Sequence, residues 1–226
     1  MRRLGTLRHG FVAAVLALVP AAAAAKDDAQ LWTGGNLAVK LGGGFQLSQE
    51  VTARFSDRRG LYEIESNTLV GYKLAPRLTL WAGYTHDPLY DHGHSTGMEH
   101  RAREQLTLDR IPAGPGALSL RLRLEQRWRE GSDGTGWRAR PYFKYSLPLG
   151  RGGTALAFSH ESFLNLNHTA FQGRTGEDRM RNALAISAPL AKGLTAEIGY
   201  LNQHSFVPGG PDTTDHVATV TLNLSL

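Results

Sequence analysis

The chain has 226 residues, of which 41% are hydrophobic and none is cysteine, so a disulfide framework and a thiolate metal site are excluded. Lysine and arginine (25) outnumber aspartate and glutamate (20), which gives a formal net charge of +5. Isolated basic tails and basic-aromatic clusters, which nucleic-acid binders use, are missing from the sequence, and this argues against a nucleic-acid partner.

The amino-terminal residues have the three parts of a secretory signal peptide. Arg2, Arg3 and Arg8 form a positive leader, residues 11–19 are apolar, and the alanines that end at Ala25 provide an Ala-x-Ala cleavage site. We predict a cleaved signal at 1–25 and one mature domain at 26–226. Cleavage leaves 22 basic against 20 acidic residues, a net charge near +2. Beyond the leader, apolar runs stay shorter than the roughly 18 residues of a membrane-spanning helix, so any membrane integration requires strands.

The stretch 117–130, ALSLRLRLEQRWRE, shows the pattern that organises the rest of the chain. Leu120, Leu122 and Leu124 fall on one parity, and Arg121 and Arg123 fall on the other. An extended strand separates these two sets onto opposite faces, whereas a helix mixes them. The length of the alternation favours a strand of about ten residues in a transmembrane barrel over the usual strand of about five or six in a soluble sheet.

Similar stretches recur along the mature chain, separated by glycine, proline and polar residues. The candidate strands are 31–41, 45–55, 61–74, 77–85, 99–111, 117–130, 137–147, 154–165, 179–188, 194–204 and 216–226. We predict long polar loops at 87–97 and 166–177 and short turns at alternate connections, an asymmetry typical of outer-membrane barrels. The expected fold is all-β, an antiparallel transmembrane β-barrel.

The strand number follows from an argument about the two ends of the chain. Bacterial barrels with both ends in the periplasm have an even number of strands. Gly34 and Gly35 weaken the candidate at 31–41. We therefore expect about twelve strands, with ten as the alternative.

Four segments carry a resemblance to a known family: LWAGYTHDP (80–88), WRARPYFKY (137–145), HESFLNLN (160–167) and AEIGYLNQH (196–204). They resemble the uncharacterised exported-barrel family catalogued as domain of unknown function 2490, over nearly the whole mature chain. The resemblance implies an outer-membrane-type β-barrel and supplies no activity, cofactor or catalytic residue. The terminal run 217–226 is similar to the apolar last strand that such barrels present to their insertion machinery, although it ends in Leu226 rather than Phe. We expect location in a Gram-negative-type outer membrane, with lipid and the insertion machinery as partners.

The charged parities form the first candidate site. If apolar residues face lipid, the opposite parities line the lumen. The predicted lumen residues are Arg121, Arg123, Arg127, Arg138, Arg140, Lys144, Arg181, Glu125 and Glu161. These charges predict either a closed, salt-bridged interior or a narrow channel for small anionic solutes such as acidic sugars or carboxylates.

A second candidate site lies on the apolar parity, near the expected outer end of the strand 154–165. His160 and Ser162 interrupt that stripe, and a hairpin centred near residue 171 brings Asn182 beside His160. Ser162 as nucleophile, His160 as general base and Asn182 as its orienting group would form a hydrolase site. Outer-membrane phospholipases and lipid A deacylases are similar in placing a His-x-Ser pair on the lipid-facing side of a strand.

Three further expectations complete the sequence analysis. We predict neither a metal site nor a cofactor, because the histidines of the 87–97 loop are typical of a solvated loop. Trp32, Trp81, Trp128 and Trp137 are expected in interfacial girdles. A soluble periplasmic β-sandwich that binds a ligand is the alternative to the membrane barrel, and a lipid hydrolase is the alternative to a structural or channel protein.

Overall fold

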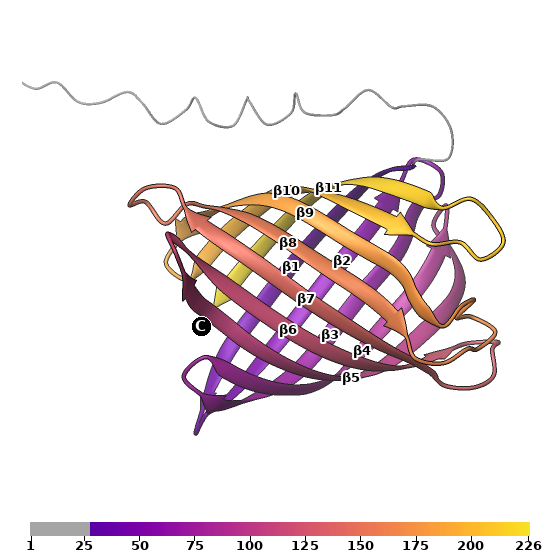
Figure 1. Ribbon diagram of the computed structural model, residues 1–226, viewed down its shortest axis with the longest axis horizontal. Helices are drawn as coiled ribbons and strands as arrows, with labels where there is room; N and C mark the ends of the chain where they lie inside the picture. The colour runs from indigo at the N-terminus through magenta and orange to yellow at the C-terminus, as the bar shows by residue number, and fades with distance from the viewer. Residues whose placement is uncertain (1–27) are drawn as a thin grey trace, which may run out of the picture.

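The computed structural model describes residues 28–226, so the predicted signal peptide lies outside the described residues. Within this range the chain forms eleven strands: β1 (Asp28–Gly42), β2 (Phe45–Ser56), β3 (Gly60–Ala75), β4 (Leu78–Asp91), β5 (His94–Ala113), β6 (Gly116–Arg129), β7 (Gly136–Pro148), β8 (Ala155–Asn165), β9 (Gly176–Ala191), β10 (Leu194–Ser205) and β11 (Thr213–Ser225). They form one closed barrel in chain order (Figure 1), not a two-sheet sandwich. No helix in residues 28–226 is long and apolar enough to cross a membrane.

The barrel is closed by β1 and β11, which lie parallel to each other. Their register runs from Asp28 opposite Asp215 to Ala38 opposite Ser225. The other ten pairings among the described strands are antiparallel. The even strand number predicted from the sequence therefore does not hold. With eleven strands the first and the last run the same way, so Asp28 and Leu226 lie at opposite ends of the barrel (Figure 1).

The weak candidate at 31–41 is a complete strand, β1, and Gly34 has a packing role in it. A Cβ on Gly34 would lie only 2.7 Å from the carbonyl oxygen of Val51 on β2. Glycine at this position permits the close approach of the neighbouring backbone. Gly34, which weakened the strand prediction, thus allows β1 to pair closely with β2.

The connections divide between two ends of the barrel, which we call the loop rim and the turn rim. The loop rim carries Asp28 and the connections β2–β3, β4–β5, β6–β7, β8–β9 and β10–β11. The turn rim carries Leu226 and the remaining connections. The long loop predicted at 87–97 is absent, because β4 continues to Asp91 and β5 begins at His94. His92 (φ 48°) and Gly93 (φ 82°) make this tight turn.

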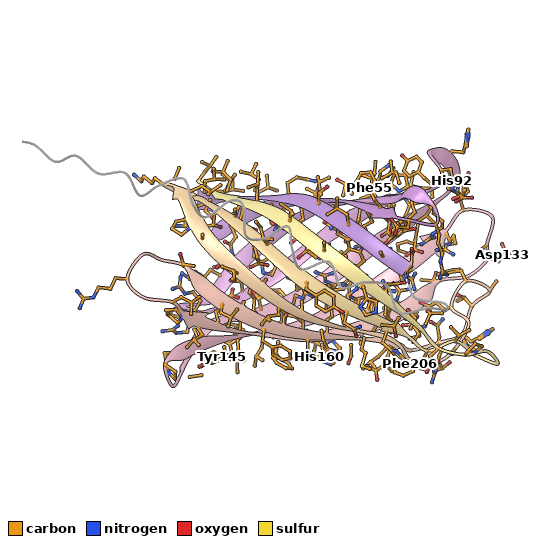
Figure 2. All side chains as sticks on the ribbon, turned by 90° about the horizontal axis from the view of Figure 1, so that it is seen from above. Phe55, His92, Asp133, Tyr145, His160 and Phe206 are labelled. Atoms are coloured by element: carbon orange, nitrogen blue, oxygen red, sulfur yellow. The ribbon has the colours of Figure 1, made fainter. Side chains whose placement is uncertain are left out.

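Side-chain direction follows the predicted parity. Leu120 and Leu122 face outward, with 39% and 58% of their surface exposed, whereas the next residue, Arg123, is 3% exposed in the lumen. Most of the buried residues are therefore polar or charged, and they lie in the lumen. Figure 2 shows side chains covering both surfaces of the wall.

The four tryptophans divide between the two surfaces. Trp128 and Trp137 face outward, as expected for a girdle. Trp32 faces the lumen instead, with the guanidinium carbons of Arg54 and Arg181 4.4 and 4.6 Å from its ring centroid. Trp81 also faces inward and donates to the Thr107 hydroxyl. The alternation is weak in 31–41 and 77–85, so it did not indicate which parity faces the lumen.

Candidate functional site

Glu125 is the centre of a network of buried charges in the lumen. It lies on β6 opposite Arg138 on β7, and its side chain is fully buried. Its Oε2 accepts from Arg138 Nη2 at 2.7 Å, and its Oε1 accepts from Arg140 Nη1 at 2.7 Å. Cross-strand pairing thus places two guanidinium groups on one carboxylate, and their positive charge offsets the cost of its burial.

The network extends from Glu125 to neighbouring strands through shared arginines. Arg140 also donates through Nε to Glu161 on β8 at 3.0 Å, and Glu161 accepts from Arg121 as well. Arg123 lies 3.5 Å from Glu125 and donates to Gln105. Six of the predicted lumen arginines and acids are therefore joined by direct contacts.

Three other predicted lumen residues lie outside these contacts. Arg127 forms a two-pronged pair with Glu99, with distances of 2.8 and 2.9 Å. Lys144 pairs with Glu197 at 2.6 Å. Arg181 donates to Gln203 at 2.8 Å and packs on aromatic rings.

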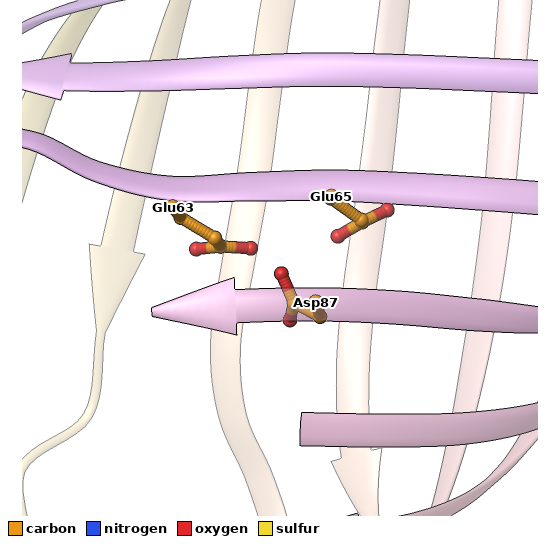
Figure 3. A group of neighbouring side chains, drawn as sticks. All are labelled: Glu63, Glu65 and Asp87. Atoms are coloured by element: carbon orange, nitrogen blue, oxygen red, sulfur yellow. The ribbon is translucent and has the colours of Figure 1, made fainter. Parts of the chain in front are cut away.

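Glu63 and Glu65 on β3 face the lumen, as their parity predicts, and a third carboxylate, that of Asp87 on β4, lies beside them. Glu63, Glu65 and Asp87 each bring an oxygen atom within 4.8 Å of the others (Figure 3). Arg54 bonds to Glu63 and Glu65, and Arg101 bonds to Glu65 and Asp87, so two guanidinium groups supply the countercharge. Asp87 was assigned to a loop, although it continues the lumen parity of Thr79, Trp81 and Thr85, which is the signal that could have found it.

Closely packed charges lie at mid-height in the lumen, and a cavity lies at the loop rim. The side chains of Arg103, Arg123 and Glu125 have exposed fractions of 0, 4 and 0%. Above them lies a cavity of about 460 Å³ with a largely charged lining that includes Arg59 and Arg129. The described residues thus form a vestibule at the loop rim with packed charges below it.

The second candidate site lies on the outward surface of β8 and β9. His160 and Asn182 are register partners, as the predicted hairpin requires, and Ser162 follows on the same face. His160 Nδ1 lies 2.8 Å from Asn182 Oδ1, and His160 Nε2 lies 3.1 Å from Ser162 Oγ. We call these three residues the outer-wall triad. Its residues are partly buried.

The contacts of the outer-wall triad select one tautomer of His160. Asn182 Oδ1 can only accept, so the imidazole proton resides on Nδ1. Nε2 then carries a lone pair and accepts the Ser162 hydroxyl proton. This is the polarity that activates a serine nucleophile, with the amide acting as a positioning group.

The triad lies at the boundary between an apolar and a more polar part of the outward surface. His160 is at the middle of β8, not near its outer end as expected, and Figure 2 shows it on the wall between Tyr145 and Phe206. Toward the turn rim, outward residues of neighbouring strands are apolar. Toward the loop rim, they include Tyr84, His86, His100, Gln126, Trp128, Trp137, Tyr200, Asn202, His204 and His216. The triad is therefore at the polar edge of an apolar band.

A family model described as "Protein of unknown function (DUF2490)" matches residues 29–214, which is most of the described barrel. The chain belongs to the DUF2490 family. An uncharacterized protein of Methylorubrum extorquens is 29% identical to this DUF2490 protein over 203 residues, covering 87% of each chain. The family resemblance stated from the sequence is thus confirmed, and the function has to be argued from the geometry of the chain itself.

Proposed function

We propose that this DUF2490 protein is an outer-membrane β-barrel that hydrolyses acyl esters of membrane lipids, with Ser162 as nucleophile. The observation that carries the proposal is the hydrogen-bonded chain from Ser162 through His160 to Asn182. A hydroxyl, a general base and an orienting group are the minimum apparatus of a serine hydrolase. Their position on the outward wall matches a substrate that approaches from a surrounding lipid layer.

The outward apolar band supports location in a membrane. Exposed outward residues include Val70, Leu80, Leu106, Leu122, Leu184, Ile186, Leu190, Ile198 and Leu222. A continuous apolar band around a closed barrel is typical of a wall in contact with hydrocarbon, because every backbone group is paired within the sheet. Export to a Gram-negative-type outer membrane, through the predicted signal peptide and the barrel insertion machinery, completes the proposal.

The proposed reaction has two steps. Ser162 Oγ attacks the ester carbonyl while His160 Nε2 accepts the hydroxyl proton. The carbon–oxygen bond to the leaving alcohol then breaks, and His160 returns the proton to that alcohol, leaving an acyl-Ser162 ester. Water, deprotonated by His160, hydrolyses this ester to release a fatty acid and restore Ser162. Asn182 holds the imidazole in the required tautomer throughout.

The test is fatty-acid release from phosphatidylethanolamine vesicles that contain the purified mature barrel. We expect Ser162→Ala to abolish release while the barrel stays folded. Ser66→Ala is a matched control, because Ser66 also faces outward and bonds to another side chain, Gln49. Absence of release from folded wild-type protein would overturn the proposal.

A second candidate function is favoured by the vestibule. Its lining includes many arginines, Arg54, Arg101, Arg127, Arg138 and Arg179 among them. Guanidinium groups bind carboxylates through paired hydrogen bonds. Binding or passage of small anionic solutes is therefore the alternative, and the packed charges below the vestibule favour binding over passage.

A further inference from the structure

An apolar groove leads across the outward wall to the triad. Its volume is about 590 Å³. The lining residues are Leu78, Leu106, Leu108, Leu120, Leu122, Pro141 and Phe143, with His160 and Ser162, and with Arg121 and Tyr142. The two catalytic side chains thus belong to the same surface depression as a row of leucines.

The strand register explains the course of this groove. Successive cross-strand partners form one row, Leu78–Leu108–Leu120–Phe143–His160. A second row, Leu106–Leu122–Pro141, lies two residues away along each strand and points toward Ser162. The groove therefore lies between two adjacent ladders of side chains that cross from β4 to β8. Leu78 follows the β3–β4 turn, so the far end lies at the turn rim.

Pro141 marks a local interruption of the wall beside Ser162. The β7–β8 pairing runs from Arg138 opposite Asn165 to Ala139 opposite Leu164 and resumes only at Tyr142 opposite Glu161. Proline has no N–H to donate to a ladder. The interruption lies where the groove meets the nucleophile, and the compact proline ring replaces a projecting side chain there.

We infer that this groove holds the acyl chain of the ester that Ser162 cleaves, so the substrate class is a membrane lipid with a long ester-linked chain. The inference rests on the proposed function. From β4 to β8 the groove crosses four strand spacings, about 19 Å in all. One leaflet of the hydrocarbon core is about 15 Å thick, so a lipid chain is long enough to occupy most of the groove. The groove is polar at Ser162 and apolar along the rest of its length, and this matches an ester group at the head of a hydrocarbon chain.

The first experiment measures chain-length preference with Leu108→Phe, which narrows the far end without touching the triad. Cleavage of a 16-carbon ester, relative to a 4-carbon ester, should fall by roughly an order of magnitude, because the longer chain alone reaches the narrowed part. Leu222→Phe on β11, outward and away from the groove, is the matched control. An unchanged ratio with retained short-chain cleavage overturns the groove assignment and leaves the hydrolase proposal intact.

A second experiment does not depend on turnover. The Ser162→Ala barrel is placed in vesicles that contain a phosphatidylethanolamine with a photoactivatable group near the end of its acyl chain. We expect crosslinks at Leu78, Leu108 or Leu120 above the level of labelling on β11, and we expect Leu108→Phe to reduce them. Uniform labelling around the barrel would overturn the inference. Enriched labelling without any wild-type hydrolysis would retain the lipid groove and reject the hydrolase.

Discussion

His160 on β8 and Asn182 on β9 lie directly opposite each other in the register of the barrel, with 2.8 Å between Nδ1 and Oδ1. This contact links the packing of two neighbouring strands to the protonation state of a ring nitrogen. It also gives the first prediction, because Asn182 acts through His160 and does not itself touch the reacting ester.

We expect Asn182→Ala to lower kcat for ester hydrolysis by roughly a hundredfold with a smaller change in KM. The alanine leaves the imidazole free to rotate and to adopt the other tautomer. Asn182→Asp, which still accepts from Nδ1, should restore most of the activity. Equal losses in both variants, or a loss confined to KM, would assign Asn182 a role in packing instead.

A buried charge in the lumen provides the second prediction. Glu125→Gln leaves Arg138 and Arg140 without a full countercharge, so the free energy of unfolding should fall by about 3–5 kcal/mol. Urea unfolding in detergent micelles measures this change. Glu104→Gln is the control, since Glu104 is exposed on the outward face and should change stability by less than about 1 kcal/mol. Similar effects of the two substitutions would contradict a buried network.

The packed charges below the vestibule lead to a prediction about ion flow. Because the side chains of Arg103, Arg123 and Glu125 are packed with at most 4% solvent exposure, wild-type barrels in a planar bilayer should show no steady conductance. Steady anion-selective current would instead favour the channel alternative. In that case Arg121→Gln with Arg123→Gln should reduce the selectivity, and unchanged selectivity would argue against passage through the lumen.

The parallel pairing of β1 and β11 predicts at which rim β1 begins. A protease site introduced immediately before Asp28 and another between Pro208 and Gly210 should be cut from the same side of the membrane, because both lie at the loop rim. A site at Gly43 should be cut only from the opposite side. Cleavage before Asp28 from the same side as Gly43 would contradict the eleven-stranded closure.

Much of the barrel could be predicted from alternating side chains, because a period of two identifies strands wherever one surface is apolar and the other charged. All eleven candidate stretches correspond to strands, and the orientation of Leu122 and Arg123 is as expected. The prediction of an even strand number was wrong because it assumed that both chain ends lie on the same side of the barrel. The relative position of the ends depends on how β1 and β11 close the barrel, and no single segment reveals it. Trp32 was expected at the membrane interface, as is typical of tryptophan in a barrel. It faces the lumen, where cation–π contacts with Arg54 and Arg181 stabilise its ring.

The candidate sites could be predicted only where local pairing determines them. The hairpin between β8 and β9 brings Asn182 to His160, and that needs only the two flanking strands. The buried charges of the lumen need contacts between strands that are not paired with each other, such as Arg101 on β5 to Glu65 on β3, which are 36 residues apart. The groove at the triad likewise depends on five adjacent strands in register, which the sequence of one strand does not reveal.

The most direct test of the proposed hydrolase is covalent labelling of the folded barrel with a long-chain alkyl fluorophosphonate, whose fluoride is displaced by a nucleophilic serine, followed by mass spectrometry of the modified peptide. The account predicts one modified residue, Ser162, with labelling lost in Ser162→Ala and strongly slowed in His160→Ala. Labelling spread over other serines, or none on a barrel that remains folded, would contradict it.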